Sequence, residues 1–305
     1  MTNVVLGAGE AGCPAGRVEA ERSAAPDPEA VAAHVIAGGS PFDFVERPEW
    51  FSYGTLDAFD RCPRQYALRY LCRLGVERPR PAADFGSAAH AAFEKFTRER
   101  RERLAHEEEP PDRADLERFF EAAWASSSLP AECDAGTWRA RAEPMLDRFW
   151  AAESADPAET IGEEVRFRMD LRPDPGPDRE PTLVITGYID RIDRLASGGV
   201  ELVDYKTGRA GSTQEAESSL QLSIYALGCR DGLGLGRPER VTLDFVEHGL
   251  RCRADRTDAE LDRVRARLAA RAREIHDSGF SPTPSRRACG WCDFAAICPV
   301  SVQES

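Results

Sequence analysis

The chain has 305 residues and a formal net charge of −13 at pH 7. Hydrophobic residues make up 42% of it and form no uninterrupted run of membrane-spanning length, and the N-terminus lacks the features of a secretory signal, so we expect a soluble, cytoplasmic protein without membrane contact. The negative charge does not exclude a nucleic-acid substrate, because a phosphate-binding surface is local and acidic metal ligands add to the negative side.

The first 44 residues or so are rich in Ala, Gly, Pro and Glu and show no sustained hydrophobic period, which predicts a flexible tail. Within it, Gly7–Gly12 has the Gly-x-Gly-x-x-Gly form of a dinucleotide-binding motif. The apolar run before it, Val4–Leu6, is too short for a core strand, and Pro14 falls inside the helix that the motif must open. We therefore interpret the motif as part of the tail and expect one domain over residues 45–305.

The rest of the chain shows both periods of regular structure. Apolar residues recur at helical spacing from Ser52 onward, and alternation typical of strands begins at about residue 163. The predicted helices cover about 52–70, 86–104, 114–126, 136–152, 216–229 and 257–277. The predicted strands cover about 164–171, 182–191, 200–206, 240–247 and 250–253.

Acidic residues close the predicted strands. Asp204 and Lys206 end one strand and share a face, since strand side chains alternate, while Asp190 ends the neighbouring strand and Glu164 lies on the one before. Three carboxylates on neighbouring strands can converge on a hard cation. The alternative is a solvated Asp–Lys pair, worth under about 1 kcal/mol. Against it, Lys206 is a lysine where the chain nearly always uses arginine, Lys95 being the other exception.

Four motifs make the interpretation specific: Phe85–His90 with Gly-x-x-x-His, Gly187–Asp193 with Ile-Asp, Val203–Gly208 with Asp-x-Lys, and Gln221–Tyr225 with Gln-x-x-x-Tyr. Together they resemble the core of the PD-(D/E)XK nucleases of the RecB/AddB exonuclease type, over roughly residues 52–298. The resemblance implies an α/β, restriction-endonuclease-like fold: a central mixed sheet flanked by helices, with a helical N-terminal part. It also implies metal-dependent hydrolysis of DNA.

The resemblance assigns roles to seven residues. Two aspartates become metal ligands, a lysine becomes catalytic, a histidine and a glutamate join the metal site, and a glutamine and a tyrosine lie near the substrate. In that order they are Asp190, Asp204, Lys206, His90, Glu164, Gln221 and Tyr225. The implied cofactor is one or two Mg²⁺ or Mn²⁺ ions, which lower the pKa of water and neutralise charge on a phosphodiester during in-line attack.

Alternatives remain open at three of these positions. Glu163 takes the place of Glu164 after a one-residue change of register. Taken alone, His90 is more often a packed helix histidine than a ligand, and only its motif favours the metal site. Asp193 lies three residues past Asp190 and should not share its strand face, so we interpret it as structural.

Nine cysteines are too few for a disulfide scaffold in a chain of this length. Three of them, Cys289, Cys292 and Cys298, lie close together near the C-terminus, which indicates a metal or cluster site. The best fourth ligand is Cys62, which precedes a proline. One cysteine before the core and three after it resemble the iron–sulfur nucleases of the AddB and CRISPR-associated RecB-like types, which implies a 4Fe–4S cluster; zinc or metal-free thiols are the alternatives. The remaining cysteines are interpreted as packing residues or free thiols: Cys13, Cys72, Cys133, Cys229 and Cys252.

Arginines at helical spacing are candidate phosphate contacts. The better set flanks Cys62 and consists of Arg61, Arg64, Arg69 and Arg73. A second set, Arg263, Arg267 and Arg271, has acidic residues nearby that equally favour a solvated face. Arg286 and Arg287 lie beside the cysteine loop. The predicted function is exonucleolytic cleavage of single-stranded DNA or DNA ends in repair or recombination. The chain shows no helicase motif, so any motor would be a separate subunit. The alternatives are a CRISPR-associated RecB-like nuclease, an inactive nucleic-acid-binding module, and a redox or zinc protein built around the cysteines.

Overall fold

The computed structural model describes residues 27–75, 81–126, 135–155, 158–171 and 183–302. They form two compact units. Of the described residues, those between 81 and 168 and between 187 and 262 belong to the first unit, and 27–75, 169–171, 183–186 and 263–302 belong to the second. The chain passes between the units within β2, β3 and α9, whose bounds are given below.

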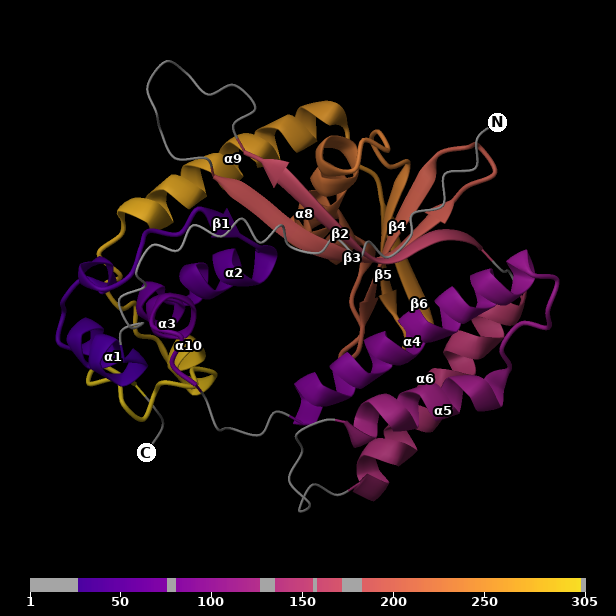
Figure 1. Ribbon diagram of the computed structural model, residues 1–305, viewed down its shortest axis with the longest axis horizontal. Coiled ribbons are helices and arrows are strands. Elements are labelled where there is room, and N and C mark those ends of the chain that lie inside the picture. Colours follow the sequence, from indigo (N-terminus) through magenta and orange to yellow (C-terminus); the bar gives the residue numbers. More distant parts are fainter. Residues whose placement is uncertain (1–26, 76–80, 127–134, 156–157, 172–182, 303–305) are drawn as a thin grey trace, which may run out of the picture. The chain divides into compact units, whose positions relative to one another are not determined.

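A mixed sheet forms the centre of the first unit (Figure 1). β4 lies between β3, to which it is antiparallel, and β5, to which it is parallel; β6 is antiparallel to β5, and β2 pairs with β3. The start of β3 also pairs with β1 in the second unit. The bounds are β1 Trp50–Phe51, β2 Glu159–Asp170, β3 Val184–Arg194, β4 Val200–Lys206, β5 Arg240–Phe245 and β6 Leu250–Ala254.

Helices cover the sheet on both faces, as the burial of β4 from Val200 to Tyr205 requires. Three helices pack together and against β4 in an apolar cluster, where the Phe93 and Phe149 rings stack at 4.1 Å and both contact Tyr205. Another helix contacts β4 and β5. The bounds are α4 Pro81–Ala105, α5 Arg113–Ala125 and α6 Ala135–Ala155 for the first group, with α7 Thr213–Ser218 and α8 Leu220–Leu227 near the other strands.

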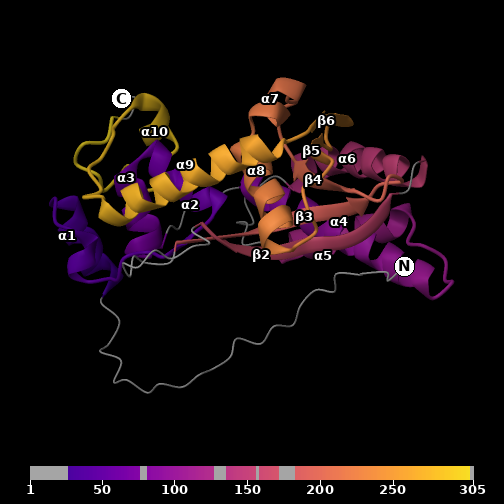
Figure 2. The same ribbon diagram turned by 90° about the horizontal axis from the view of Figure 1, so that it is seen from above.

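Short helices around an aromatic cluster make up the second unit. Phe280 stacks on Tyr66 with ring centroids 5.8 Å apart and meets Phe59 edge-on. Figures 1 and 2 both place α10 beside α3, although the two are far apart in the sequence. The bounds are α1 Pro28–Ile36, α2 Tyr53–Arg61, α3 Pro63–Tyr66, a π-helical turn Ala67–Leu71, most of α9 Asp258–Asp277, and α10 Arg286–Gly290.

The α/β fold with a mixed, helix-flanked sheet confirms the predicted fold class, while two local predictions are wrong. The predicted flexible tail contains α1, which is capped by the Asp27 side chain and buries Val31 and Val35; nine residues are too few for a sustained period to show in the sequence. The helix predicted at 216–229 is broken at Ser219, which leaves the helical conformation and caps α8. Residues 1–26, with the motif Gly7–Gly12, lie outside the described residues.

Among the residues that the structure describes, no helix has the length and apolar character needed to cross a membrane.

Candidate metal site and four-cysteine site

β4 ends in the two residues predicted to carry the chemistry. Asp204 and Lys206 share a face, and Lys206 Nζ lies 2.6 Å from Asp204 Oδ2. Tyr205 between them points the other way, into the aromatic cluster. The Asp204 side chain is 1% exposed and that of Lys206 is 35% exposed, so the ammonium reaches solvent while its carboxylate partner does not.

Helix α8 supplies two further predicted residues. Lys206 Nζ donates to Gln221 Oε1 at 2.8 Å, and Gln221 Nε2 donates to Tyr225 Oη at 3.0 Å. Gln221 and Tyr225 are one helical turn apart, which lets both side chains face the same strand. Burial raises the pKa of Tyr225 far above its usual range, so its hydroxyl stays protonated. The lysine is therefore held between one carboxylate and one oriented amide.

Asp190 is fixed by the backbone of the neighbouring strand. Tyr205 N–H donates to Asp190 Oδ2 at 2.9 Å, and the same oxygen lies 3.3 Å from His90 Nδ1 on α4. His90 also bonds to the Tyr205 backbone. The Gly86 backbone approaches closely here, since a Cβ at Gly86 would lie 2.9 Å from Thr207 Oγ1. The Gly-x-x-x-His spacing thus matches a helix that passes directly over the end of β4.

Glu164 completes the group through an irregular strand. Its φ of +45° lies in the left-handed region, which typically costs about 1–3 kcal/mol for a non-glycine residue. One ligand atom each of His90, Glu164 and Asp190 lies within 4.8 Å of the others. Glu163 instead forms a two-point ion pair with Arg101, at 3.2 and 3.0 Å. Of the two alternatives at this position, the structure therefore brings Glu164 to the group.

The carboxylates raise one another's proton affinity. Burial, followed by the charge of Asp190, raises the pKa of Glu164 to about 7. Burial and the charge of Asp204 raise the pKa of Asp190 well above its ordinary value. Burial lowers the pKa of His90, so its imidazole favours the neutral form that binds metal. The carboxyl groups of Glu164, Asp190 and Asp204 therefore lie close together without enough positive charge among the described residues to offset theirs.

These residues fit a divalent cation. Asp204 Oδ2 is buried and accepts no hydrogen bond within the described residues, because its contact with Lys206 is an ion pair without hydrogen-bond geometry. Carboxylate oxygens with one imidazole nitrogen suit Mg²⁺ or Mn²⁺. His90, Glu164 and Asp190 are thus a candidate metal site in the first unit, and Asp204 is a neighbouring carboxylate outside this group of mutually close ligand atoms.

The raised pKa of Glu164 makes the stability of the metal-free protein depend on pH. The folded state keeps a proton on Glu164 up to about pH 7, whereas the unfolded chain loses it near 4.5. The unfolded state therefore binds fewer protons in this window, so the free energy of unfolding falls as pH rises from about 4.5 to 7. We expect Glu164→Gln to reduce this fall by about 1–2 kcal/mol, less than the full shift because the group is partly exposed to solvent. Urea titrations in EDTA across this range measure it, and an equal fall in both proteins would contradict it.

Two residues that the motifs did not single out lie beside the group. Glu94 is one helical turn after His90 and contributes to the raised pKa of Glu164. Its four-residue spacing from His90 is the sequence feature that could have placed it on the same helix face. Arg191, 1% exposed, donates to Glu153 at 2.7 Å, to Asp193 at 2.7 Å and to Tyr205 Oη at 3.2 Å. Asp193 therefore takes part in a buried network outside the metal group.

The four predicted cysteines line one pocket in the second unit. Cys62 joins α2 to α3, and the other three come from α10 and the segment after it. Burial and then the three neighbouring thiols raise the pKa of Cys292. The rest of the lining is largely apolar, with Leu68, Phe294 and Ala295 among it. All four cysteines are free of disulfides, as are the three described cysteines elsewhere, Cys72, Cys229 and Cys252. Cys13 and Cys133 lie outside the described residues.

The arginines predicted to contact phosphate differ in their burial and in their ion pairs. The prediction is wrong for Arg64, which is 8% exposed and so cannot reach a surface phosphate. Arg61 pairs with Asp57 at 3.0 Å, and Arg69 pairs with Asp293. Arg271 is half-buried and pairs with Asp60 and Glu274. The exposed arginines of the predicted sets are Arg61, Arg73, Arg263, Arg267, Arg286 and Arg287.

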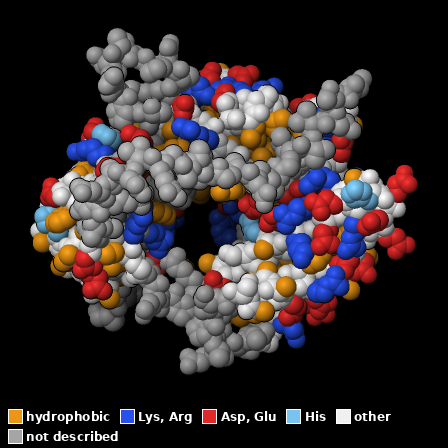
Figure 3. Space-filling model, viewed as in Figure 1, with side chains coloured by type: hydrophobic (Ala, Val, Ile, Leu, Met, Phe, Trp, Pro, Cys, Tyr) orange, Lys and Arg blue, Asp and Glu red, His pale blue; other side chains and the backbone are white. Residues whose placement is uncertain are grey.

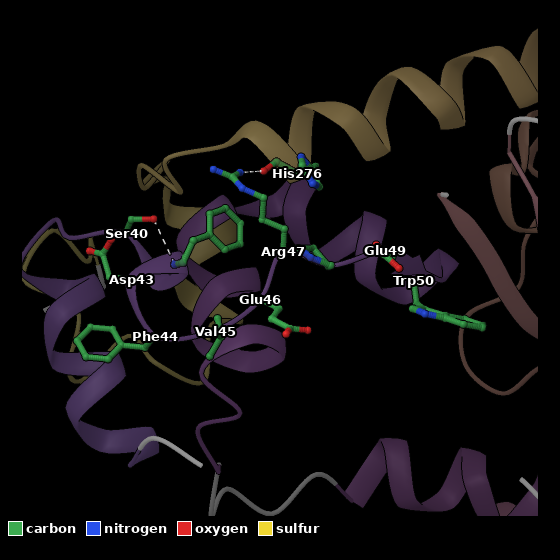
Figure 4. A pocket seen from close by; sticks show the side chains of 11 residues that line it. Ser40, Asp43, Phe44, Val45, Glu46, Arg47, Glu49, Trp50 and His276 are labelled. Carbon is green, nitrogen blue, oxygen red and sulfur yellow. Dashed lines mark hydrogen bonds between the residues drawn. The ribbon is translucent and has the colours of Figure 1, made fainter. Parts of the chain in front are cut away.

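A large hollow of about 1030 Å³ in the second unit lies between His276 and residues 40–50 (Figure 4). Arg47 donates to the His276 carbonyl across it. Its acidic residues, Asp43, Glu46 and Glu49, disfavour a phosphate ligand. None of the predicted catalytic or metal-binding residues lines it.

Comparisons with known proteins agree with the acidic motifs. The model of the PD-(D/E)XK nuclease superfamily matches residues 50–299. The Gene 69 proteins of Mycobacterium phages D29 and L5 are each 28% identical, over 125 and 123 residues, which is 39% and 38% of this chain and 44% and 40% of theirs. The chain thus covers less than half of these relatives. The crystal structure of SSO0001 aligns over 90% of this chain and 96% of its own, with a TM-score of 0.37 and 14% identity.

Proposed function

Because the chain belongs to the PD-(D/E)XK nuclease superfamily, we propose that it is a Mg²⁺- or Mn²⁺-dependent deoxyribonuclease of the RecB-like exonuclease type. The observation that carries this proposal is the convergence of Asp204, Lys206 and Asp190 at the end of β4 with His90 and Glu164. A hydrolytic nuclease needs both a cation site and a nearby fixed positive charge, and the two occur together here.

The proposed mechanism divides the work between the ion and the chain. His90, Glu164, Asp190 and Asp204 would hold the cation, which lowers the pKa of an attacking water and neutralises charge on the phosphoryl oxygens. The chain's own contribution is Lys206. Its ammonium, oriented by Gln221, stabilises negative charge on the phosphate as it builds up, without reorganising at the moment of reaction. Tyr225 keeps Gln221 in place by accepting its N–H.

DNA as substrate, and its free or single-stranded ends in particular, are proposed from the resemblance to the RecB and AddB exonucleases. On the face of the molecule in Figure 3, basic and acidic side chains alternate over α4–α6. Many of them are paired, such as Arg98 with Glu94 and Arg103 with Glu99. A DNA strand is therefore better accommodated near the exposed arginines elsewhere than on these helices. Cytoplasmic repair or recombination, with or without a separate helicase subunit, is part of the same proposal.

We further propose that the cysteines bind a 4Fe–4S cluster, which ties α3 to the C-terminal segment. Four thiols from distant segments in one largely apolar pocket support it. Iron, sulfide and zinc counted per chain distinguish such a cluster from a single zinc ion, since both use tetrahedral thiolate sites.

The test of the nuclease proposal is direct. Purified protein is incubated with end-labelled single- and double-stranded DNA and with circular single-stranded DNA, in Mn²⁺ or EDTA. We expect cleavage of linear DNA that requires the ion, with the circular substrate left intact. Cleavage of the circle would contradict the exonuclease assignment alone. Binding of DNA without any cleavage would contradict the enzyme assignment and support the binding-module alternative.

Gly86→Ala is expected to lower the cleavage rate about 10-fold, since a small displacement of a positioned group can cost 10²-fold. The added methyl group meets Thr207 Oγ1 and pushes α4, with His90, away from Asp190. In the double variant Gly86→Ala/Thr207→Gly the obstructing atom is gone, so activity should return toward that of the Thr207→Gly protein. Rate measurements at saturating Mn²⁺ compare the three proteins. If the double variant is no better than Gly86→Ala, the close approach is not the cause.

A further inference from the structure

Arg64 is a buried arginine in the pocket of the four cysteines. It follows Cys62 and Pro63 in α3, is 8% exposed, and lines the same pocket as the thiols. Its Nε is buried and has no hydrogen-bond partner within the described part of the chain. A buried charged group with an unsatisfied donor costs about 1–3 kcal/mol or more. Such a group calls for an anionic partner.

The described lining of the pocket contains no carboxylate to serve as that partner. Apart from Arg64 it consists of cysteines, apolar residues, prolines, Gln65 and Ser301. Asp293, the acidic residue that follows Cys292, pairs with Arg69. Gln65 Oε1 is likewise buried without a partner, and a half-turn of its amide would turn an N–H into the same space. Both side chains therefore offer donors to a pocket whose only potential anions are thiolates.

We propose that Arg64 is the buried counter-ion of the metal group held by Cys62, Cys289, Cys292 and Cys298. This inference rests on the proposed cluster. Four thiolates around an oxidised 4Fe–4S core carry a net charge of −2, as do four thiolates around one zinc ion, and burying such a dianion is costly without a neighbouring cation. A guanidinium suits this role because it stays charged when buried and directs N–H donors in a fixed plane.

The role has an electrochemical consequence for an iron–sulfur cluster. Uptake of one electron from dithionite takes the assembly from −2 to −3, and a fixed positive charge stabilises the more negative state further. Hydrogen bonds to the sulfurs act in the same direction. Removing Arg64 therefore lowers the reduction potential and loosens the metal. A merely structural arginine would leave the potential unchanged.

The test compares the full-length wild-type protein with Arg64→Met, Arg64→Lys and the control Arg61→Met, all purified without oxygen. Arg61 precedes Cys62 but is exposed and paired with Asp57, so its loss removes the same charge from the same segment without opening the pocket. Iron, sulfide and zinc are counted per chain. The midpoint potential is then measured by spectroscopic titration, and metal release by transfer to a chelator.

We expect Arg64→Met to show a lower midpoint potential and metal release faster by about 10-fold or more. Arg64→Lys, which keeps the charge, should lie between it and the wild type, and Arg61→Met should match the wild type. Wild-type behaviour of Arg64→Met in both measurements would overturn the proposal. If Arg64→Met does not fold, Arg64→Lys decides by the shift of its potential. If the wild-type protein contains no metal, both the proposed cluster and the proposed role of Arg64 are overturned. If it contains zinc in place of iron, the cluster is overturned, and the rate of zinc release to the chelator decides whether Arg64 is the counter-ion.

Discussion

Replacing Lys206 by methionine should reduce DNA cleavage by about 10²–10³-fold or more, the loss typical of removing one oriented group that stabilises transition-state charge. Methionine keeps much of the stem and removes only the charge. The fold should persist, since Lys206 lies at the end of β4 with its ammonium partly in solvent. Cleavage rates at saturating Mn²⁺ and the circular dichroism spectrum measure the two effects separately.

The chain provides its own control for this variant. Lys95, the other lysine, is exposed on α4, lies over the Phe119 ring and is 4.0 Å from Glu99. Lys95→Met should keep near-wild-type activity. Lys206→Arg should not restore activity, because a planar guanidinium cannot place a compact charge between Asp204 and Gln221. Full activity of Lys206→Met would refute the catalytic assignment.

Replacing Cys62 by alanine should release most of the bound metal and lower the melting temperature. In the proposed metal site, Cys62 closes a loop that reaches to the C-terminal cysteines, with which it lines one pocket. By the chain-entropy scaling used for cross-links, a loop of this length contributes roughly 5 kcal/mol. The expected loss is part of that value, because the three remaining cysteines retain some metal. Iron content and thermal unfolding are the measurements.

Cys72→Ala is the matched control for this prediction. Cys72 is also buried and follows the same helical segment, yet it does not line the pocket. Its loss should cost only the packing of one small side chain and leave the metal content unchanged. Equal metal content in Cys62→Ala and the wild type would show that Cys62 is not a ligand.

The elements around the proposed active site could be predicted because simple periodicity determines them. Alternation along residues 200–206 predicts that Asp204 and Lys206 share a face, and the four-residue spacing predicts that Gln221 and Tyr225 do so as well. The choice between Glu163 and Glu164 could not be made this way. The left-handed backbone at Glu164 breaks the alternation that a strand prediction assumes, and only the position of Arg101 shows which carboxylate is already paired.

Other features depended on contacts between distant segments. Helical spacing does not show that Arg61, Arg64 and Arg69 fall in three successive elements, α2, α3 and the π-helical turn, or that Arg64 lines a pocket with the C-terminal cysteines. The break at Ser219 is similar, because serine is compatible with a helix interior and becomes a cap only when the chain turns.

Tyr205 belongs to two environments at once. Its ring packs against the stacked rings of Phe93 and Phe149, while its backbone N–H donates to Asp190 and its backbone also bonds to His90. A change in the size of either phenylalanine should therefore shift the Tyr205 backbone, to which both Asp190 and His90 are bonded. The geometry of the proposed active site thus depends on hydrocarbon packing on the other face of β4, and a substitution in that packing should lower activity without changing a proposed metal ligand.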